Sequence, residues 1–332
     1  MQHDFSRAEI TTYANRNALI MGEITLRELD PVLQELARTN CNENPDTAVE
    51  QIEVIQEWIR KSPHLRASNN PQFILAFLRR CKFSLEKTKK RIDNYYAIKN
   101  IFQEVLCERE LSDELIEFYR TGIHIIPNKP IALDGPAVMI SQYCKIDSKK
   151  WNPRLAFKLL FILFETLAME SDNASIVGLT YIIDCRDVGV DLMMQFDSFL
   201  LKKGYTVAEN CMPLKLKEIH VINMRREGVS VFNFIPSFLP STLTFKFVAH
   251  KKAEHLFECI PRDAVTVEYG GNNGYLAEAI KSFEQILLLY REHFKEDGNF
   301  GTNEKLRIGH KKEWELSELS GVSGSFRKLE LD

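Results

Sequence analysis

The chain has 332 residues, of which 45% are hydrophobic and 27% charged, and its formal net charge at pH 7 is -3. This composition is typical of a globular protein with a sizeable core, and it excludes a globally basic nucleic-acid-binding protein. Seven scattered cysteines, without any CxxC pair, favour reduced thiols over a disulfide framework or a zinc site.

Two sequence features bear on the location of the protein. The opening MQHDFSRAEI lacks a basic segment followed by an apolar stretch, so we expect no signal peptide. The most apolar run, residues 155–169, is short and contains Lys158 and Glu165, which argues against a membrane-spanning helix. We therefore expect a cytoplasmic protein.

In chain order, the first part of the sequence predicts helices. Thr47 and Glu50 stand in capping-box spacing at the start of an apolar pattern of helical period. A second helix is predicted with Asn70 as its N-cap and Pro71 at its first position, and a third begins at Ser84. No strand is predicted in this part of the chain.

After about residue 130 the pattern changes to alternating strands and helices. Such alternation predicts an α/β domain with a largely parallel sheet. The predicted strands cover 135–144, 178–185, 218–224 and 245–250, and the predicted helices cover 153–170, 191–204 and a segment from about 276. We expect four parts: a helical extension (1–45), a helical domain (46–125), an α/β domain (126–290) and a polar tail (291–332) that is loosely attached from Lys295.

The sequence lacks the common signatures of catalysis and cofactor binding, since it contains no GxGxxG, GxxxxGK[ST] or GxSxG. His250 and His255 are five residues apart and do not share a helical face, so we expect no metal site from them. Asp184, Cys185 and Asp187 follow a predicted strand, where a strand-ending turn is favoured over an active site. The sequence therefore predicts no enzyme, no cofactor and no metal.

The stretch VFNFIPSFLP at residues 231–240 is rich in large apolar side chains and contains no charge. In helical turns Phe234 and Phe238 would form one i,i+4 pair, and Ile235 and Leu239 another. Together with Phe232, these side chains would forfeit about 7–15 kcal/mol if they were left in water. A protein core, a bound ligand or a bilayer must therefore cover them.

Several stretches together resemble the CRAL-TRIO family of lipid-binding proteins. They are FILAFLRRCKFSLEKT, GLTYIIDCRDVG, KEIHVINM and VTVEYGG, and the match spans about residues 45–290. The ending GSFRKLELD is similar to insect members of the branch that contains the α-tocopherol transfer and cellular retinaldehyde-binding proteins. The resemblance implies an α/β lipid-binding cage with an all-helical N-terminal domain, and a movable lid over an apolar cavity.

On this resemblance, residues 231–240 belong to the lid, although packing as ordinary core stays open. Because side chains alternate along strands, Thr180 shares a face with Ile182, and Ile219 with Val221, but the face that lines the cavity is left open. The ligand-binding residues that we predict are Leu160, Phe161, Phe164, Thr180, Ile182, Ile219, Val221, Phe232, Phe234, Ile235, Phe238, Leu239 and Leu243.

Basic residues flank the predicted lid: residues 202–252 hold nine Lys and Arg against three Glu, a local excess of six. A solvated surface is one explanation. The resemblance implies another, in which Lys215, Lys217 and Lys246 bind phosphoinositide head groups at an anionic membrane. Thr242 stands where the branch has a further lysine. Leu214 stands where phosphatidylinositol-transfer members have an acidic residue, and this departure favours an isoprenoid-like ligand.

We therefore expect an intracellular carrier that binds one retinoid- or tocopherol-like molecule under a lid. It would exchange this molecule at phosphoinositide-containing membranes, with transient peripheral association. Two alternatives stay open, a phosphatidylinositol or phospholipid exchanger and a non-carrier, membrane-associated adaptor.

Overall fold

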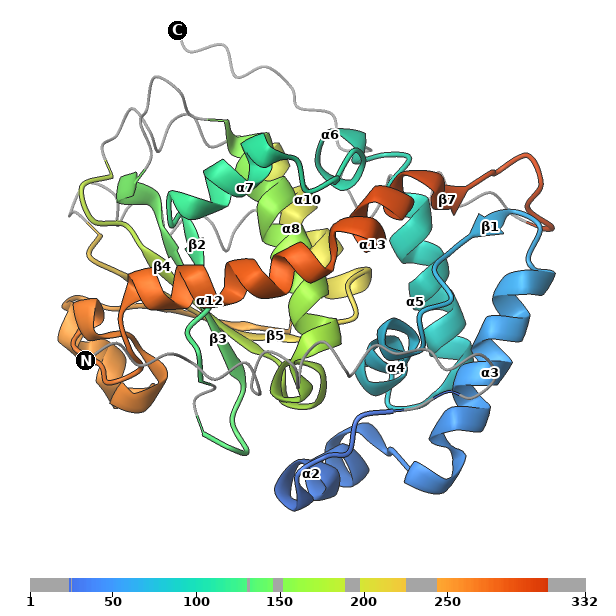
Figure 1. Cartoon of the computed structure of the whole chain (residues 1–332), viewed down its shortest axis with the longest axis horizontal. Coiled ribbons are helices and arrows are strands. Elements are labelled where there is room, and N and C mark those ends of the chain that lie inside the picture. The colour runs from blue at the N-terminus through green and yellow to red at the C-terminus, as the bar shows by residue number, and fades with distance from the viewer. Residues whose placement is uncertain are drawn as a thin grey trace, which may run out of the picture.

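The computed structural model describes residues 24, 26–129, 132–145, 152–188, 198–224 and 244–309. Helices from the first part of the chain lie beside a sheet that is built from the second part (Figure 1). This arrangement confirms the predicted fold class, an all-helical N-terminal part and an α/β part. In the ranges that the model describes, every helix is too short or too polar to cross a membrane.

The N-terminal part consists of six described helices. They are α2 (Pro31–Cys41), α3 (Pro45–Lys61), α4 (Pro71–Arg80), α5 (Leu85–Ile98), α6 (Gln103–Leu106) and α7 (Asp113–Arg120). Asn70 caps α4 as predicted, because its side-chain oxygen accepts from the Phe73 amide at 3.0 Å. The predicted capping box at Thr47 is wrong. Asn44 caps α3 instead, with Pro45 at the first helical position.

The sheet has five strands in the order β2-β3-β4-β5-β6. They are β2 (His124–Ile125), β3 (Ala137–Gln142), β4 (Leu179–Asp184), β5 (Leu216–Ile222) and β6 (Lys246–Ala249). Strands β3 to β6 are parallel and confirm the four predicted strands, whereas β2 pairs antiparallel at the edge. Sequence analysis missed β2 and β1 (Leu65–Arg66) because two-residue strands carry no alternating pattern.

Each face of the sheet has its own cover. Helices α8 (Pro153–Glu170) and α10 (Ser198–Asn210) share a hydrophobic core with one face. The other face packs in a smaller aliphatic core against short 3₁₀ helices, η4 (Ala253–Glu258), η5 (Arg262–Ala264) and η6 (Val267–Tyr269). Helix α8 has the predicted bounds, whereas α10 runs past its predicted end at residue 204.

The C-terminal part returns to the N-terminal helices. Helices α12 (Leu276–Leu289) and α13 (Arg291–Glu296) lead to β7 (Gly301–Thr302), which pairs antiparallel with β1 (Figure 1). The Arg307 guanidinium donates to both carboxylate oxygens of Asp93 on α5, at 2.7 and 2.8 Å. The expectation of a loosely attached tail from Lys295 is therefore wrong for residues 295–309, and residues 310–332 lie outside the described ranges.

A buried cluster of charges, here called the charged junction, joins α5, α8 and the C-terminal part. Its members are Tyr95, Lys99, Arg109, Glu165, His293 and Asp297. The Arg109 guanidinium lies 2.7 Å from Glu165 and 2.8 Å from Asp297. Burial pulls the pKa of Glu165 upward, but Arg109 and His293 outweigh burial and hold that pKa well below its ordinary value.

Candidate ligand-binding site

Three of the predicted ligand-binding residues lie on α8. The side chains of Leu160, Phe161 and Phe164 are buried in the core that α8 shares with the sheet. The rings of Phe161 and Phe164 pack edge to face at 6.0 Å, and Phe164 packs in the same way on Tyr181 of β4 at 6.4 Å. These contacts form a continuous row of packed aromatic rings from α8 to strand β4 of the sheet.

The predicted strand residues divide between the two faces. Ile219 and Val221 pair in register with Tyr181 and Ile183 and belong to the α8 face. Ile182 belongs to the opposite core, and Thr180, two residues before it on the strand, points to that same side. A single cavity on the α8 face can therefore include Ile219 and Val221, but it cannot include Thr180 or Ile182.

Five half-buried aromatic residues that sequence analysis missed pack against the α8 core. We call them the aromatic wall; they are Tyr143, Phe157, Tyr205, Phe245 and Phe247. The Tyr205 ring lies 5.5 Å from the Phe245 ring and 6.2 Å from the Phe247 ring. Helix α10 approaches α8 closely at Gly204, where an added Cβ would lie only 2.4 Å from Phe157.

The tyrosines of the aromatic wall are deep in the protein and still accessible. Burial raises the pKa of both Tyr143 and Tyr205 above the ordinary value, so both phenols stay protonated. Each side chain nevertheless keeps part of its surface accessible.

A chain of buried hydrogen bonds, here called the hydroxyl relay, ends at this wall. His124 Nε2 lies 3.0 Å from the Ala156 carbonyl, which can only accept, so Nε2 carries the proton. His124 Nδ1 therefore accepts from Ser141 Oγ at 2.5 Å, and Ser141 accepts from the Tyr181 hydroxyl at 2.6 Å. Tyr181 in turn hydrogen-bonds Tyr143. The relay brings hydroxyl groups to the apolar α8 face.

The predicted lid lies outside the described residues. Residues 225–243 are not described, and this range contains six predicted ligand-binding residues. They are Phe232, Phe234, Ile235, Phe238, Leu239 and Leu243. The described chain resumes with Phe245 and Phe247, two members of the aromatic wall. The lid therefore stays a prediction.

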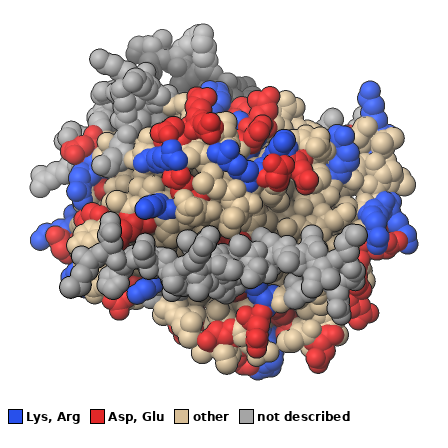
Figure 2. All heavy atoms as spheres, viewed as in Figure 1, with Lys and Arg blue, Asp and Glu red and all other residues tan. Residues whose placement is uncertain are grey.

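The three predicted phosphoinositide-binding lysines lie on neighbouring strands. Lys215 and Lys217 are at the start of β5, and Lys246 begins β6, where it pairs in register with Glu218. Lys215 and Lys246 are exposed, and the Lys246 ammonium lies 3.8 Å from the Glu218 carboxylate. On the face seen in Figure 2, Lys and Arg side chains intermix with Asp and Glu among the described residues.

Three of the four stretches that carry the family resemblance, GLTYIIDCRDVG, KEIHVINM and VTVEYGG, meet at Asp184. Its carboxylate accepts from the Arg186 amide at 2.9 Å, from the Asn223 side chain at 2.8 Å and from the Tyr269 hydroxyl at 2.9 Å. Gly271 allows this close packing, since a Cβ there would lie 1.8 Å from the Val265 carbonyl oxygen. Asp184 thus fastens the ends of β4 and β5, which supports the structural interpretation of this turn over an active site.

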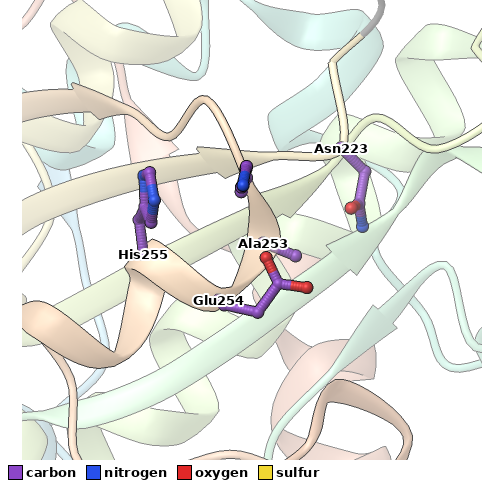
Figure 3. A pocket seen from close by; sticks show the side chains of 5 residues that line it. Asn223, Ala253, Glu254 and His255 are labelled. Atoms are coloured by element: carbon purple, nitrogen blue, oxygen red, sulfur yellow. The ribbon is translucent and has the colours of Figure 1, made fainter.

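An open surface pocket of about 680 Å³ lies on the other side of the sheet from α8. Its lining comprises Asn223, Lys252, Ala253, Glu254 and His255 (Figure 3). The side chain of Asn223 is already engaged by Asp184. The pocket is polar and contains none of the predicted ligand-binding residues, so it does not match an apolar ligand.

Comparisons with known proteins agree with this geometry. Residues 126–271 match the family model of the CRAL/TRIO domain, and residues 44–116 match that of the Pinta-like UBA domain. The chain belongs to the CRAL-TRIO family. A CRAL-TRIO protein of this kind falls in a family of lipid-binding and lipid-transfer proteins, and this membership supports a lipid-carrier role.

Relatives of this CRAL-TRIO protein include the mouse protein named alpha-tocopherol transfer protein-like. It is 24% identical over 276 residues, which cover 78% of this chain and 74% of that protein. Clavesin-1 from Xenopus laevis is 21% identical over 247 residues, which cover 73% of this chain and 74% of that protein. The crystal structure of Sfh5 aligns with a TM-score of 0.47 and 15% identity over 82% of this chain.

Proposed function

We propose that this chain carries one small hydrophobic molecule between α8, α10 and the sheet, and exchanges it at membranes. The ligand we infer is an isoprenoid of the retinoid or tocopherol class. Such a molecule has a long apolar body and few polar atoms, which suits a pocket that is mostly apolar with a few polar anchors. One of the two named relatives supports this class, since it is named alpha-tocopherol transfer protein-like.

The observation that carries the proposal is the hydroxyl relay beside the aromatic wall. The apolar body of the ligand would pack on Phe157, Tyr205, Phe245 and Phe247. Its hydroxyl group would donate to the Tyr143 oxygen at the end of the relay, where burial makes each hydrogen bond worth more than at the surface. A phospholipid head group would instead need charged partners. The described α8 face offers Leu214 where such partners are expected.

For release, we infer that residues 231–240 act as a lid. Their five large apolar side chains would cover the ligand in one state and contact a bilayer in the other. Lys215, Lys217 and Lys246 would draw the protein to phosphoinositides, each basic residue contributing about 1 kcal/mol near an anionic leaflet. In this proposal the lid covers the ligand, and the three lysines determine which membranes the protein binds.

Identification of the bound molecule tests the ligand. Protein from its own tissue would be measured by native mass spectrometry, and the bound material would be extracted with organic solvent and identified. We expect one isoprenoid per chain. A phospholipid would favour the exchanger instead. Protein that is empty, and that takes up neither retinoids, tocopherol nor phospholipids, would overturn the carrier and favour the adaptor.

Transfer between vesicles tests the exchange step. Phe234→Asp combined with Phe238→Asp should slow ligand transfer while the circular dichroism spectrum stays unchanged. Lys215→Gln combined with Lys217→Gln should remove the acceleration that phosphatidylinositol bisphosphate in acceptor vesicles gives the wild type. Replacement of Lys61, an exposed lysine on α3, by Gln is the matched control. Unchanged transfer in all variants would contradict the lid and the membrane contact.

A further inference from the structure

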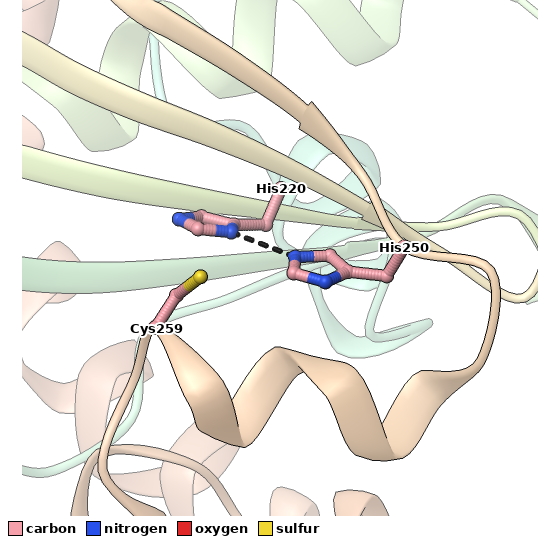
Figure 4. A group of neighbouring side chains, drawn as sticks. All are labelled: His220, His250 and Cys259. Atoms are coloured by element: carbon pink, nitrogen blue, oxygen red, sulfur yellow. Dashed lines mark hydrogen bonds between the residues drawn. The ribbon is translucent and has the colours of Figure 1, made fainter.

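A second group of side chains lies on the face of the sheet away from α8. His220 is near the end of β5, His250 directly follows β6, and Cys259 directly follows η4. Figure 4 shows the two imidazole rings and the thiol pointing toward one another. One ligand atom from each of the three residues lies within 4.8 Å of the other two. We propose that these residues bind a Zn²⁺ ion.

The distances suit zinc after small side-chain movements. Zinc bonds of about 2.0–2.3 Å place the ligand atoms of a tetrahedral site roughly 3.3–3.8 Å apart. His220 Nδ1 and His250 Nε2 are 2.9 Å apart and would separate by a few tenths of an ångström. Cys259 is exposed, so its thiol can rotate inward by the remaining ångström. Three protein ligands leave the fourth position to water.

The surroundings of His220 favour a metal ligand over a simple hydrogen bond. His220 is fully buried, and its Nε2 lies 3.0 Å from the Glu218 carboxylate. A carboxylate that accepts from the far nitrogen of an imidazole fixes the ring and turns the other nitrogen toward the metal. Here this arrangement leaves Nδ1 facing His250.

The donor set selects the metal. Two imidazole nitrogens and one thiolate suit zinc, whereas Mg²⁺ and Ca²⁺ prefer oxygen ligands. The Cys259 thiolate and the Glu218 carboxylate supply two negative charges, which balance the two positive charges of the zinc ion. Lys246 lies 3.8 Å from Glu218 and partly offsets them. The ion, the thiolate, the Glu218 carboxylate and the Lys246 ammonium would together carry one net positive charge, which the solvent at the exposed Cys259 side can screen.

An ion bound at this position would link segments that are far apart in the sequence. His220 belongs to the strand before residues 225–243, and His250 follows the edge strand after them. A bound ion would tie β5, the end of β6 and Cys259 together, on the face opposite to the proposed ligand. The metal would therefore link the strands that precede and follow residues 225–243 in the chain. This inference does not depend on the identity of the ligand.

Metal titration of the full chain, without a histidine tag and stripped with a chelator, tests the proposal. We expect wild-type protein to bind one Zn²⁺ per chain by calorimetry and to show a thiolate-to-metal charge-transfer band with Co²⁺. Cys259→Ser and His250→Gln should lose the band. Cys107→Ser, which replaces a half-buried thiol on the C-terminal side of α6, is the matched control and should keep it.

The Glu218→Gln variant tests whether these residues bind a metal ion or only form hydrogen bonds with one another. Loss of the carboxylate partner should weaken Zn²⁺ binding by about 10–100-fold, with the same stoichiometry. Circular dichroism would verify that each variant is folded. The proposal is overturned if wild-type protein binds no Zn²⁺, or if Cys259→Ser binds Zn²⁺ and Co²⁺ as the wild type does.

Discussion

The charged junction and the aromatic wall include different parts of α8, Glu165 in its second half and Phe157 in its first turns, and they differ in how their side chains are satisfied. At the junction, the buried charges of Arg109, Glu165 and Asp297 meet partners within 3 Å. At the wall, large aromatic rings such as Tyr205 and Phe247 keep accessible surface. A fully satisfied cluster fixes one arrangement of the chain, whereas uncovered apolar surface needs a further occupant. The contrast teaches that the charged junction holds α8 in the fold, whereas the aromatic wall is the part of the α8 core at which we propose the ligand.

Removal of the central cation should break the junction with the largest effect. Arg109→Met would leave Glu165 and Asp297 buried with less compensation, and should lower the free energy of unfolding by about 3–5 kcal/mol. Urea denaturation measures this change. Arg38→Met, at an exposed pair with Glu35 on α2, is the control and should leave stability unchanged. Equal stability of the two variants would contradict the assigned role of the junction.

As the pH falls, folding stability should be lost first through His124 in the hydroxyl relay and only at lower pH through Glu165 in the charged junction. Burial lowers the pKa of His124 from 6.5 to about 4, so the unfolded chain binds a proton that the folded chain does not bind in this range. The stability is therefore complete above pH 6.5 and falls as the pH drops to 4, by about 3 kcal/mol. The lowered pKa of Glu165 means that its contribution is lost only below about pH 4.5.

Denaturation midpoints measured from pH 7 to pH 4 check this order. His124→Gln keeps a polar side chain but cannot titrate, so its stability should fall less than that of the wild type between pH 6.5 and 4.5. Parallel curves for the two proteins across this interval would show that His124 is not the titrating group.

The smallest effect should come from shortening the hydroxyl relay. Tyr181→Phe removes the hydrogen bond to Ser141, which is worth about 0.5–1.5 kcal/mol. If the relay orients the polar end of the ligand, affinity for an isoprenoid alcohol should fall by up to about tenfold. Fluorescence titration of delipidated protein measures this change.

Tyr96→Phe is the matched control for that experiment. Tyr96 is equally buried, but its hydroxyl accepts from the Ser68 amide at 2.9 Å in the helical part. Its loss should cost similar stability and leave ligand affinity unchanged. An affinity loss of the same size in both variants would mean that stability, and not the relay, controls binding.

The sequence alone determined the elements whose signals are local. Asn70 and Pro71 mark the start of α4, since a cap acts on amides within one turn. The apolar, β-branched runs of β4 and β5 predicted both strands, and the order of the stretches that carry the resemblance identified the family. Each of these signals lies within a few residues of the feature that it predicts.

Only the tertiary structure decided which side chains meet. Alternation groups Thr180 with Ile182, but the helix that covers each face is set by packing between distant segments. The hydroxyl relay joins β2, β3, β4 and the start of the 3₁₀ helix η2 (Tyr143–Lys145). The group of His220, His250 and Cys259 joins three elements that no short sequence pattern links. Such groups arise because folding brings distant residues within bonding distance, and no local spacing records that distance.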